Sequence, residues 1–153
     1  MRKKIMLSGI ATIIQRDKKT GKIIDKEIIK NLVVNSGLER VAKMIGDTES
    51  GLSAFSTIAL GTDNTAVTAN DTSLGTEVKR ESVTVTYEAS YKVKFYKIFT
   101  AGSGESYSIV EAGVFDSLIE SGSTMLDRFT FSAKTLDSSN DLEISITITV
   151  SAS

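Results

Sequence analysis

The segment Leu142-Glu-Ile-Ser-Ile-Thr-Ile-Thr-Val150 alternates aliphatic and polar residues without interruption. Successive side chains of a β-strand point to opposite faces, so a strand here places all five aliphatic side chains on one face. This pattern is typical of an antiparallel sheet with one buried and one solvated face. The segment therefore predicts an all-β fold in which its aliphatic face lines the core.

Other apolar runs, separated by turn-forming residues, extend this prediction over the chain. The turn Asp17-Lys-Lys-Thr-Gly21 joins the first two runs into an N-terminal hairpin. The spacing of Ile in residues 22–30 also fits a helix, but its β-branched residues favour a strand. About eight strands joined by turns predict an antiparallel β-sandwich or jelly-roll-like fold. Strands are expected at residues 5–15, 22–34, 55–60, 82–87, 92–99, 107–115, 125–132 and 142–150, and a long polar loop at residues 62–76.

One short α-helix is predicted after the hairpin. Ser36-Gly-Leu-Glu39 matches a capping box, and Gly46 stands where a left-handed residue ends many helices. The apolar stripe of this helix is expected to pack on a sheet, although it could instead bind a partner. Its members are Leu38, Val41, Ala42 and Ile45.

The 153 residues are expected to form a single domain. Residues 1–34 form an N-terminal β-hairpin or arm, and residues 35–153 form the helix and the sandwich. Residues 1–50 hold 11 Lys and Arg against 6 Asp and Glu, a polarity that favours head-to-tail contact between copies or is ordinary solvated surface. Residues 5–34 carry a run of seven Ile between positions 10 and 29, more than one hairpin can shield, so residues 5–34 are expected to contact a neighbouring subunit.

The residues that are absent exclude several kinds of chemistry. The chain has no His, Cys, Pro or Trp. It therefore lacks the commonest general base and metal ligand, any thiolate nucleophile and any disulfide, and we expect no enzyme, no metal site and no cofactor. A net charge of −1 supplies no basic field, so neither nucleic acid nor a membrane is an expected partner. The lack of Cys favours synthesis in the cytoplasm.

The first residues have some features of a signal peptide. Residues 1–14 start with basic residues and continue into an apolar run, but Ser8, Gly9 and Thr12 interrupt that run. No stretch of the chain is apolar over the length needed to span a bilayer. We therefore expect the segment to form the first strand.

Two loops have some features of ligand sites. Leu60-Gly-Thr-Asp-Asn64, followed by Asn70-Asp71, has the oxygen ligands that Ca²⁺ prefers, but its spacing fits no EF-hand and a structural turn is favoured. Ala101-Gly-Ser-Gly-Glu105 resembles a phosphate-binding loop only in its glycines, so it is expected to connect two strands.

Glu111 is the most unusual charge, because it lies in an otherwise apolar strand where an unpaired carboxylate is costly. It could form an acid–base pair with Asp116. The favoured interpretation is structural, with Arg128 or Lys134 as its partner or a place at a subunit contact.

The tyrosines could line a platform for sugars or bases. Aromatic residues make up only 7% of the chain, so packing in the core and at its rim is favoured. The tyrosines are Tyr87, Tyr91, Tyr96 and Tyr107.

Three segments, residues 58–74, 109–115 and 124–131, resemble in order and spacing a family of small structural proteins of tailed bacteriophages. In that family a Leu-Gly-Thr turn opens a polar loop that closes on Thr-x-Leu-x-x-Glu, which is present here as Thr72-Ser-Leu-Gly-Thr-Glu77. A Glu-Ala-Gly-hydrophobic-Phe strand and a final hairpin follow. The resemblance covers most of the chain from about Gly37 onward.

The resemblance implies a non-catalytic structural protein of the virion, made in the cytoplasm of the host bacterium. The leading expectation is an accessory subunit of the tail, baseplate or fibre. Alternatives are a protein that decorates the capsid or anchors a head fibre, and a carbohydrate-binding receptor module. The expected partners are other virion proteins and further copies of the chain.

Overall fold

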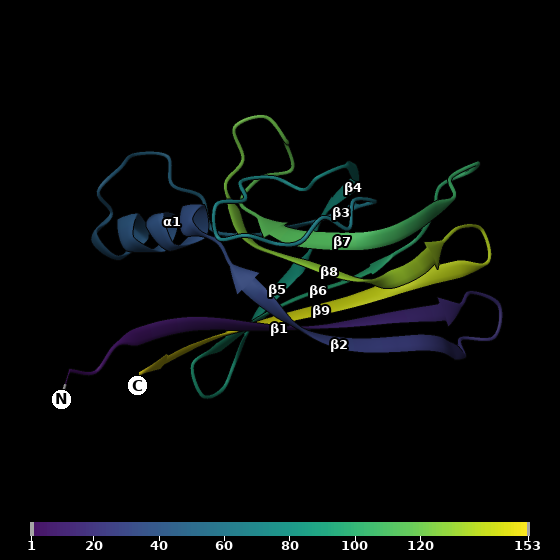
Figure 1. The fold of residues 1–153 in the computed structure, drawn as a ribbon, viewed down its shortest axis with the longest axis horizontal. Helices are drawn as coiled ribbons and strands as arrows, with labels where there is room; N and C mark the ends of the chain where they lie inside the picture. The colour runs from purple at the N-terminus through teal and green to yellow at the C-terminus, as the bar shows by residue number, and fades with distance from the viewer. Residues whose placement is uncertain (1, 153) are drawn as a thin grey trace.

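The computed structural model describes residues 2–152. They form a nine-stranded antiparallel sheet and one helix, which confirms the predicted all-β fold with an N-terminal hairpin and a single short helix (Figure 1). The elements are β1 (Ile5–Asp17), β2 (Ile23–Val33), α1 (Asn35–Gly46), β3 (Thr57–Gly61), β4 (Glu77–Ser82), β5 (Thr84–Glu88), β6 (Lys92–Phe99), β7 (Tyr107–Phe115), β8 (Met125–Leu136) and β9 (Asn140–Ala152).

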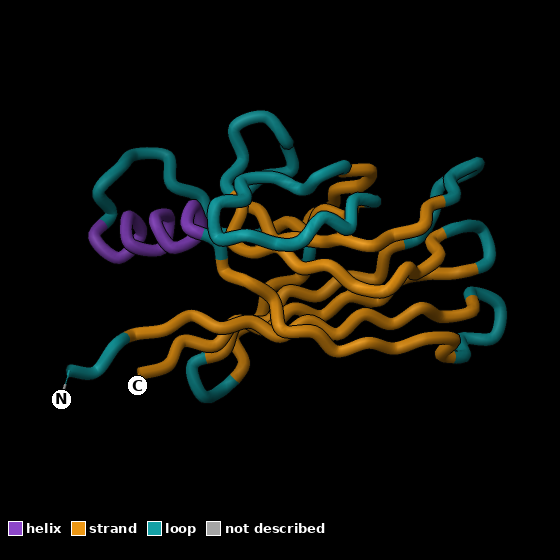
Figure 2. Tube along the Cα trace, in the orientation of Figure 1, coloured by secondary structure: helices purple, strands orange, loops and turns teal. Residues whose placement is uncertain are grey.

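The strands lie in two stacked layers. The lower layer has the order β2-β1-β9-β6-β5 and the upper layer the order β4-β3-β7-β8. The end of β2 leaves the lower layer and pairs with β8 through Leu32 opposite Arg128 and Val33 opposite Asp127. This short junction makes the layers one continuous sheet. Figure 2 shows long loops around the upper layer and short turns in the lower one.

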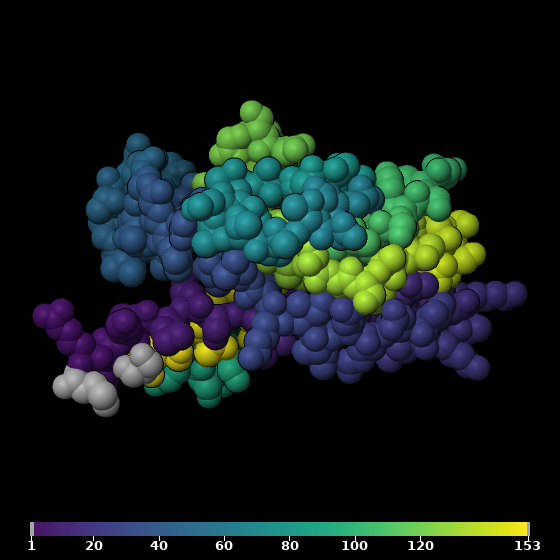
Figure 3. Space-filling model, viewed as in Figure 1, coloured from purple at the N-terminus to yellow at the C-terminus, as the bar shows by residue number. Residues whose placement is uncertain are grey.

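The core lies between the two layers, and β9 supplies much of it. Leu142, Ile144 and Ile146 are fully buried and Ile148 is 3% exposed, as their alternation with polar residues predicted. Val150 is the exception at 44% exposed. Val150 lies near the end of β9, which projects together with the start of β1 beyond the upper layer (Figure 1). In Figure 3 the helix stands above the projecting end of β1 with open space between them.

The predicted hairpin forms, but it is an integral part of the sandwich and not a projecting arm. Strand β1 lies between β2 and β9 and pairs with β9 along its whole length. Ala11 and Ile13 are fully buried in the central core. Residues 1–34 are therefore continuous with the sandwich, because Ala11, Ile13 and the partly buried Leu7 of β1 pack in its core.

Strand β4 was not predicted. Its sequence Glu77-Val-Lys-Arg-Glu-Ser82 is rich in charge and has no clear alternation. The strand lies at one edge of the sheet, where charged side chains reach solvent or each other. Arg80 pairs with Glu77 at 2.7 Å and covers the ring of Phe115, with its guanidinium carbon 4.1 Å from the ring centre.

Helix α1 is present as predicted, but the predicted caps are wrong. Val34 occupies the N-cap position, and no side chain caps the helix. The Ser36 hydroxyl instead donates to the carbonyl of Met125 at 2.9 Å. The left-handed residue at the end is Asp47 rather than Gly46.

The predicted packing of the helix is also largely wrong. Of the apolar stripe, Leu38 is 45% exposed and Ile45 is 83% exposed, whereas Val41 packs partly on the core. The closest approach to β8 is made by Gly37, where an added Cβ would collide with the main chain of Leu126. A small residue, and not the apolar stripe, therefore sets how the helix meets the sheet.

Candidate functional site

Glu111 lies on β7, in the middle of the upper layer, and its side chain is fully buried beneath the loop of residues 62–76. Arg128, on the neighbouring strand β8, is 3% exposed and meets the Glu111 carboxylate at 2.9 Å. The pairing of Glu111 with Arg128 is therefore confirmed, and Lys134 is not its partner. Burial of a charge is tolerated here because an opposite charge and hydrogen bonds compensate it.

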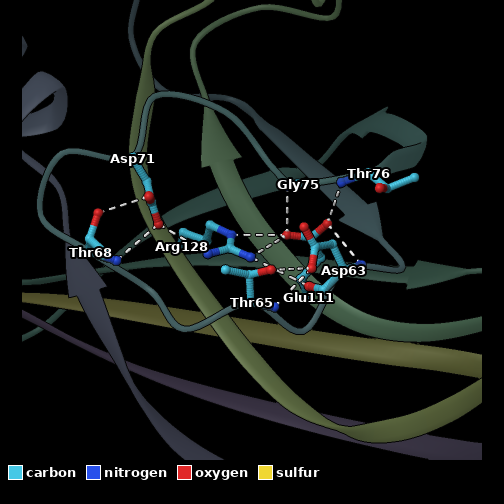
Figure 4. A network of polar contacts seen from close by, with 8 residues as sticks. All are labelled: Asp63, Thr65, Thr68, Asp71, Gly75, Thr76, Glu111 and Arg128. Carbon is cyan, nitrogen blue, oxygen red and sulfur yellow. Dashed lines mark hydrogen bonds and ion pairs between the residues drawn. The ribbon is translucent and has the colours of Figure 1, made fainter.

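The Glu111 carboxylate also accepts three hydrogen bonds from the main chain of the loop (Figure 4). The N–H of Asp63 donates from the start of the loop at 3.2 Å. The N–H groups of Gly75 and Thr76 donate from its end at 3.0 and 2.9 Å. Glu111 thus holds both ends of the loop, and both its oxygens are engaged.

Gly61, opposite Glu111 on β3, explains how the carboxylate reaches the loop. A Cβ at this position would collide with the Glu111 side chain. The Leu-Gly-Thr turn therefore needs glycine for the close approach of a buried side chain, and not for an unusual backbone angle.

The loop itself contains two carboxylates, Asp63 and Asp71, and both belong to the same network of polar contacts. Asp63 accepts from the hydroxyl and N–H of Thr65 at 2.6 and 2.8 Å, and these bonds lower the pKa of Asp63. Partial burial raises the pKa of Asp71, but hydrogen bonds from Thr68 and from Arg128 at 3.0 Å outweigh it and lower the pKa. These bonds are those of a structural turn, which was the favoured interpretation of the loop.

A surface hollow of about 440 Å³ lies over this loop, lined by Asp63, Asp71 and Arg128 among others. Within residues 2–152, no three carboxylates come close enough together to hold a metal ion. In the position that a cation would take, the guanidinium of Arg128 already contacts Asp71 and Glu111.

Asp116 does not join Glu111. It pairs with Arg40 of the helix at 2.5 Å and accepts from the N–H of Thr124 at 2.7 Å. The suggested acid–base pair is therefore not formed. In the loop of residues 101–105, the N–H of Gly102 donates to the carboxylate of Glu105 at 2.8 Å, so a side chain of the loop itself takes the position of an anion.

The four tyrosines do not form a common platform. Tyr87 and Tyr91 are each 73% exposed at the β5–β6 hairpin. The hydroxyl of Tyr96 donates to Glu143 at 2.5 Å, and this bond lowers the pKa of Glu143. Tyr107 packs against the core. Packing therefore accounts for Tyr107 alone, while Tyr87 and Tyr91 remain as exposed aromatic surface.

The structure contains two further buried charges that the sequence analysis does not predict. The side chain of Lys134 on β8 is fully buried, and its amino group contacts Asp25 at 3.2 Å and Glu27 at 2.8 Å, both on β2. Asp127 is fully buried beside Asn31, also on β2, and burial raises its pKa to about 7. The one available signal was Asp127 itself, a carboxylate within the apolar run Met125-Leu-Asp-Arg-Phe129.

The clearest surface for a partner is the outer face of the β1–β2 hairpin, here called the hairpin outer face. In the register Thr12 opposite Ile28 and Ile10 opposite Lys30, even-numbered side chains point away from the core. Four large apolar side chains on this face are between 40% and 64% exposed. They are Met6, Ile10, Ile28 and Leu32. Lys26 and Lys30 lie exposed among them.

Comparisons with protein-family models, with curated proteins and with solved structures find no match to the chain. Among the described residues, no helix is both long and apolar enough to cross a membrane.

Proposed function

We propose that the protein is a non-catalytic structural subunit of a tailed-bacteriophage particle and that it binds another particle protein through the hairpin outer face. The resemblance of residues 58–74, 109–115 and 124–131 to small phage structural proteins supports the class. An accessory position in the tail, baseplate or fibre is the leading placement. Capsid decoration or anchoring of a head fibre is the alternative.

The observation that carries the proposal is the hairpin outer face. Ile28 at 64% exposed and Ile10 at 51% exposed are diagonal neighbours on adjacent strands, which is within reach of long side chains, so the two lie together and not as isolated exposed residues. Contiguous apolar surface with a polar rim is typical of a protein–protein contact. Lys26 and Lys30 supply a basic rim, which fits a partner with acidic residues around an apolar centre.

The position of this face in the fold also suits an assembly role. The hairpin is held by the pairing of β1 with β9, and the inner face of β1 is anchored in the core by Ala11 and Ile13. A surface on such a rigid support loses little conformational entropy on binding.

Incorporation into particles tests the proposal. Ile28→Lys should leave the thermal melt unchanged, because Ile28 is exposed, but should lower the amount of the protein in purified particles by about tenfold or more. Ile119→Lys is the matched control, since Ile119 is 70% exposed on a loop away from the hairpin. It should be incorporated like the native protein. Particles would be purified from a phage that carries the gene, and the protein quantified against the major capsid protein by mass spectrometry.

Two results would count against the proposal. If the native protein is missing from particles that contain their other structural proteins, the virion assignment is wrong. If Ile28→Lys is incorporated as well as Ile119→Lys, the hairpin outer face is not the contact surface.

A further inference from the structure

Strand β5 leaves one edge of the sheet open. It pairs with β6 on one side and is the last strand of the sheet on the other. Four of its five residues are exposed, including Val85 at 41% and Tyr87 at 73%. An edge of this kind presents main-chain N–H and C=O groups to which another strand can bind.

The two edges of the sheet differ in how they are protected. Strand β4, at the opposite edge, contains Glu77, Lys79, Arg80 and Glu81. Charged residues on an edge strand prevent pairing with other chains. Strand β5, Thr84-Val-Thr-Tyr-Glu88, has one charge at its end and otherwise only the β-branched and aromatic residues that favour sheet. Of the two edge strands, only β4 carries several charged side chains of the kind that prevent pairing with another chain.

Exposed aromatic surface lies directly beside the open edge. At the β5–β6 turn, Ser90 and Tyr91 have φ of 65° and 66°, a left-handed conformation that is costly for residues other than glycine. The N–H of Tyr91 donates to the Tyr87 hydroxyl at 3.3 Å, and its carbonyl accepts from Val150 at 3.0 Å. A hollow of about 330 Å³ beside Tyr91 is lined by Ile5, Val150 and Ala152 as well.

We infer that a second copy of this chain pairs with β5, the two β5 strands running antiparallel about a twofold axis at Thr86. The lower layers of the two copies then form one continuous sheet. This contact is distinct from the hairpin outer face and does not depend on the proposed function.

The sequence of β5 is complementary to itself in this register, which is the reason for choosing a second copy as the partner. When Thr86 faces Thr86 of the second copy, all five residues of each strand are paired. Val85 then faces Tyr87 of the second copy, a pairing of aromatic and β-branched side chains that stabilises sheets. Glu88 faces Thr84, so no like charges are opposed. Such a contact uses the same surface twice and closes as a dimer.

Charge reversal on the axis tests the pairing. Because residue 86 faces itself, Thr86→Lys alone and Thr86→Glu alone each place two like charges opposite one another. Each variant should raise the dissociation constant of the dimer by about tenfold or more. An equimolar mixture of the two variants should regain dimers, all of them containing one copy of each. Thr48→Lys, which adds the same charge at an exposed position outside the sheet, should dimerise like the native protein.

Sedimentation velocity over a range of concentrations gives the dissociation constants, native mass spectrometry identifies the mixed dimers, and circular dichroism verifies that each variant is folded. Thr86 is exposed, so both variants should fold. If the native protein is monomeric at every concentration measured, the inference is wrong, and the partner of the β5 edge would be a strand of a different protein. Dimers that persist in Thr86→Lys overturn it too, as does a mixture of the variants that stays monomeric.

Discussion

The variant Asp127→Asn is expected to be more stable than the native protein above pH 7 and to lose most of its pH dependence between pH 5 and 8. Asp127 is fully buried at the junction where β2 joins the two layers. Asn31 donates to one of its oxygens, and the N–H of Val114 donates to the other at 3.0 Å. These are neutral donors, and among residues 2–152 no cation pairs with the carboxylate.

The sign of the effect follows from the pKa of Asp127. Burial raises this pKa from its ordinary value of 3.8 to about 7, although Asn31 and Val114 oppose the change. The folded protein therefore binds this proton more tightly than the unfolded chain does. This tighter proton binding stabilises the folded protein. The stabilisation is fully present below pH 3.8, declines as the pH rises and is lost above about pH 7.

The size of the effect is large for a single group. A change of one pKa unit corresponds to about 1.4 kcal/mol, so the full cost of ionising Asp127 in the folded protein is about 4 kcal/mol. Between pH 5 and 8, the native protein should lose about 2–3 kcal/mol of its free energy of unfolding. The chain has no His, so no other side chain has an ordinary pKa in this range.

Asn should replace the neutral acid well because it offers the same hydrogen bonds. The side-chain oxygen of Asn31 is buried without a donor in the described structure. A protonated Asp127 can donate to that oxygen once the Asn31 amide is turned over, and an Asn at position 127 can do so at every pH. The cost of the substitution at pH 5 should therefore be within about 1 kcal/mol.

Urea unfolding followed by circular dichroism at pH 5, 6, 7 and 8 measures this directly. Asp137→Asn is the matched control, because hydrogen bonds from Ser139 and Asn140 lower the pKa of Asp137 still further below this pH range. Its slope with pH should equal that of the native protein. A native protein whose stability is flat from pH 5 to 8, or an Asp127→Asn variant with the native slope, would refute the reasoning.

Two further predictions concern the loop and the core. Glu111→Ala should destabilise the protein by about 3–5 kcal/mol in urea unfolding, because Arg128 loses its buried partner and three loop N–H groups lose their acceptor; a loss below about 1 kcal/mol would contradict the loop-holding role. Ile146→Ala should cost about 2–5 kcal/mol, since Ile146 is fully buried. Thr147→Ala, on the outer face of β9, should change stability by less than about 0.5 kcal/mol, so equal effects in thermal melts would contradict the orientation of this strand.

Much of the fold was predictable from local patterns. The alternation over residues 142–150 identified both the strand and its buried face, because a shift of one residue would bury Glu143 and expose every Ile. The turn at residues 17–21 identified the first hairpin. Glu111 was recognised as a paired structural charge because an isolated carboxylate in an apolar strand is costly. Each of these inferences depends on neighbours in the sequence.

The features that were predicted wrongly or not at all depend on the position of a segment in the assembled fold and not on its neighbours in the sequence. Strand β4 lies at an edge, where side chains need no apolar alternation, so nothing in its sequence marked it as a strand. The capping pattern at Ser36 was outweighed by a hydrogen bond to Met125, a residue distant in the chain. The contact of Gly37 with Leu126 turned the apolar stripe of the helix partly toward solvent.

By itself the sequence determined most of the elements: which segments other than β4 are strands, which faces of these strands are apolar and which loop is polar, because these depend on the period of side chains along one segment. Only the tertiary structure decided the order of the strands, with β1 between β2 and β9, and therefore the burial of Asp127 and the exposure of the β5 edge. The physical reason is that these properties arise from contacts between segments far apart in the chain. A buried carboxylate and an open edge exist only once the layers are assembled.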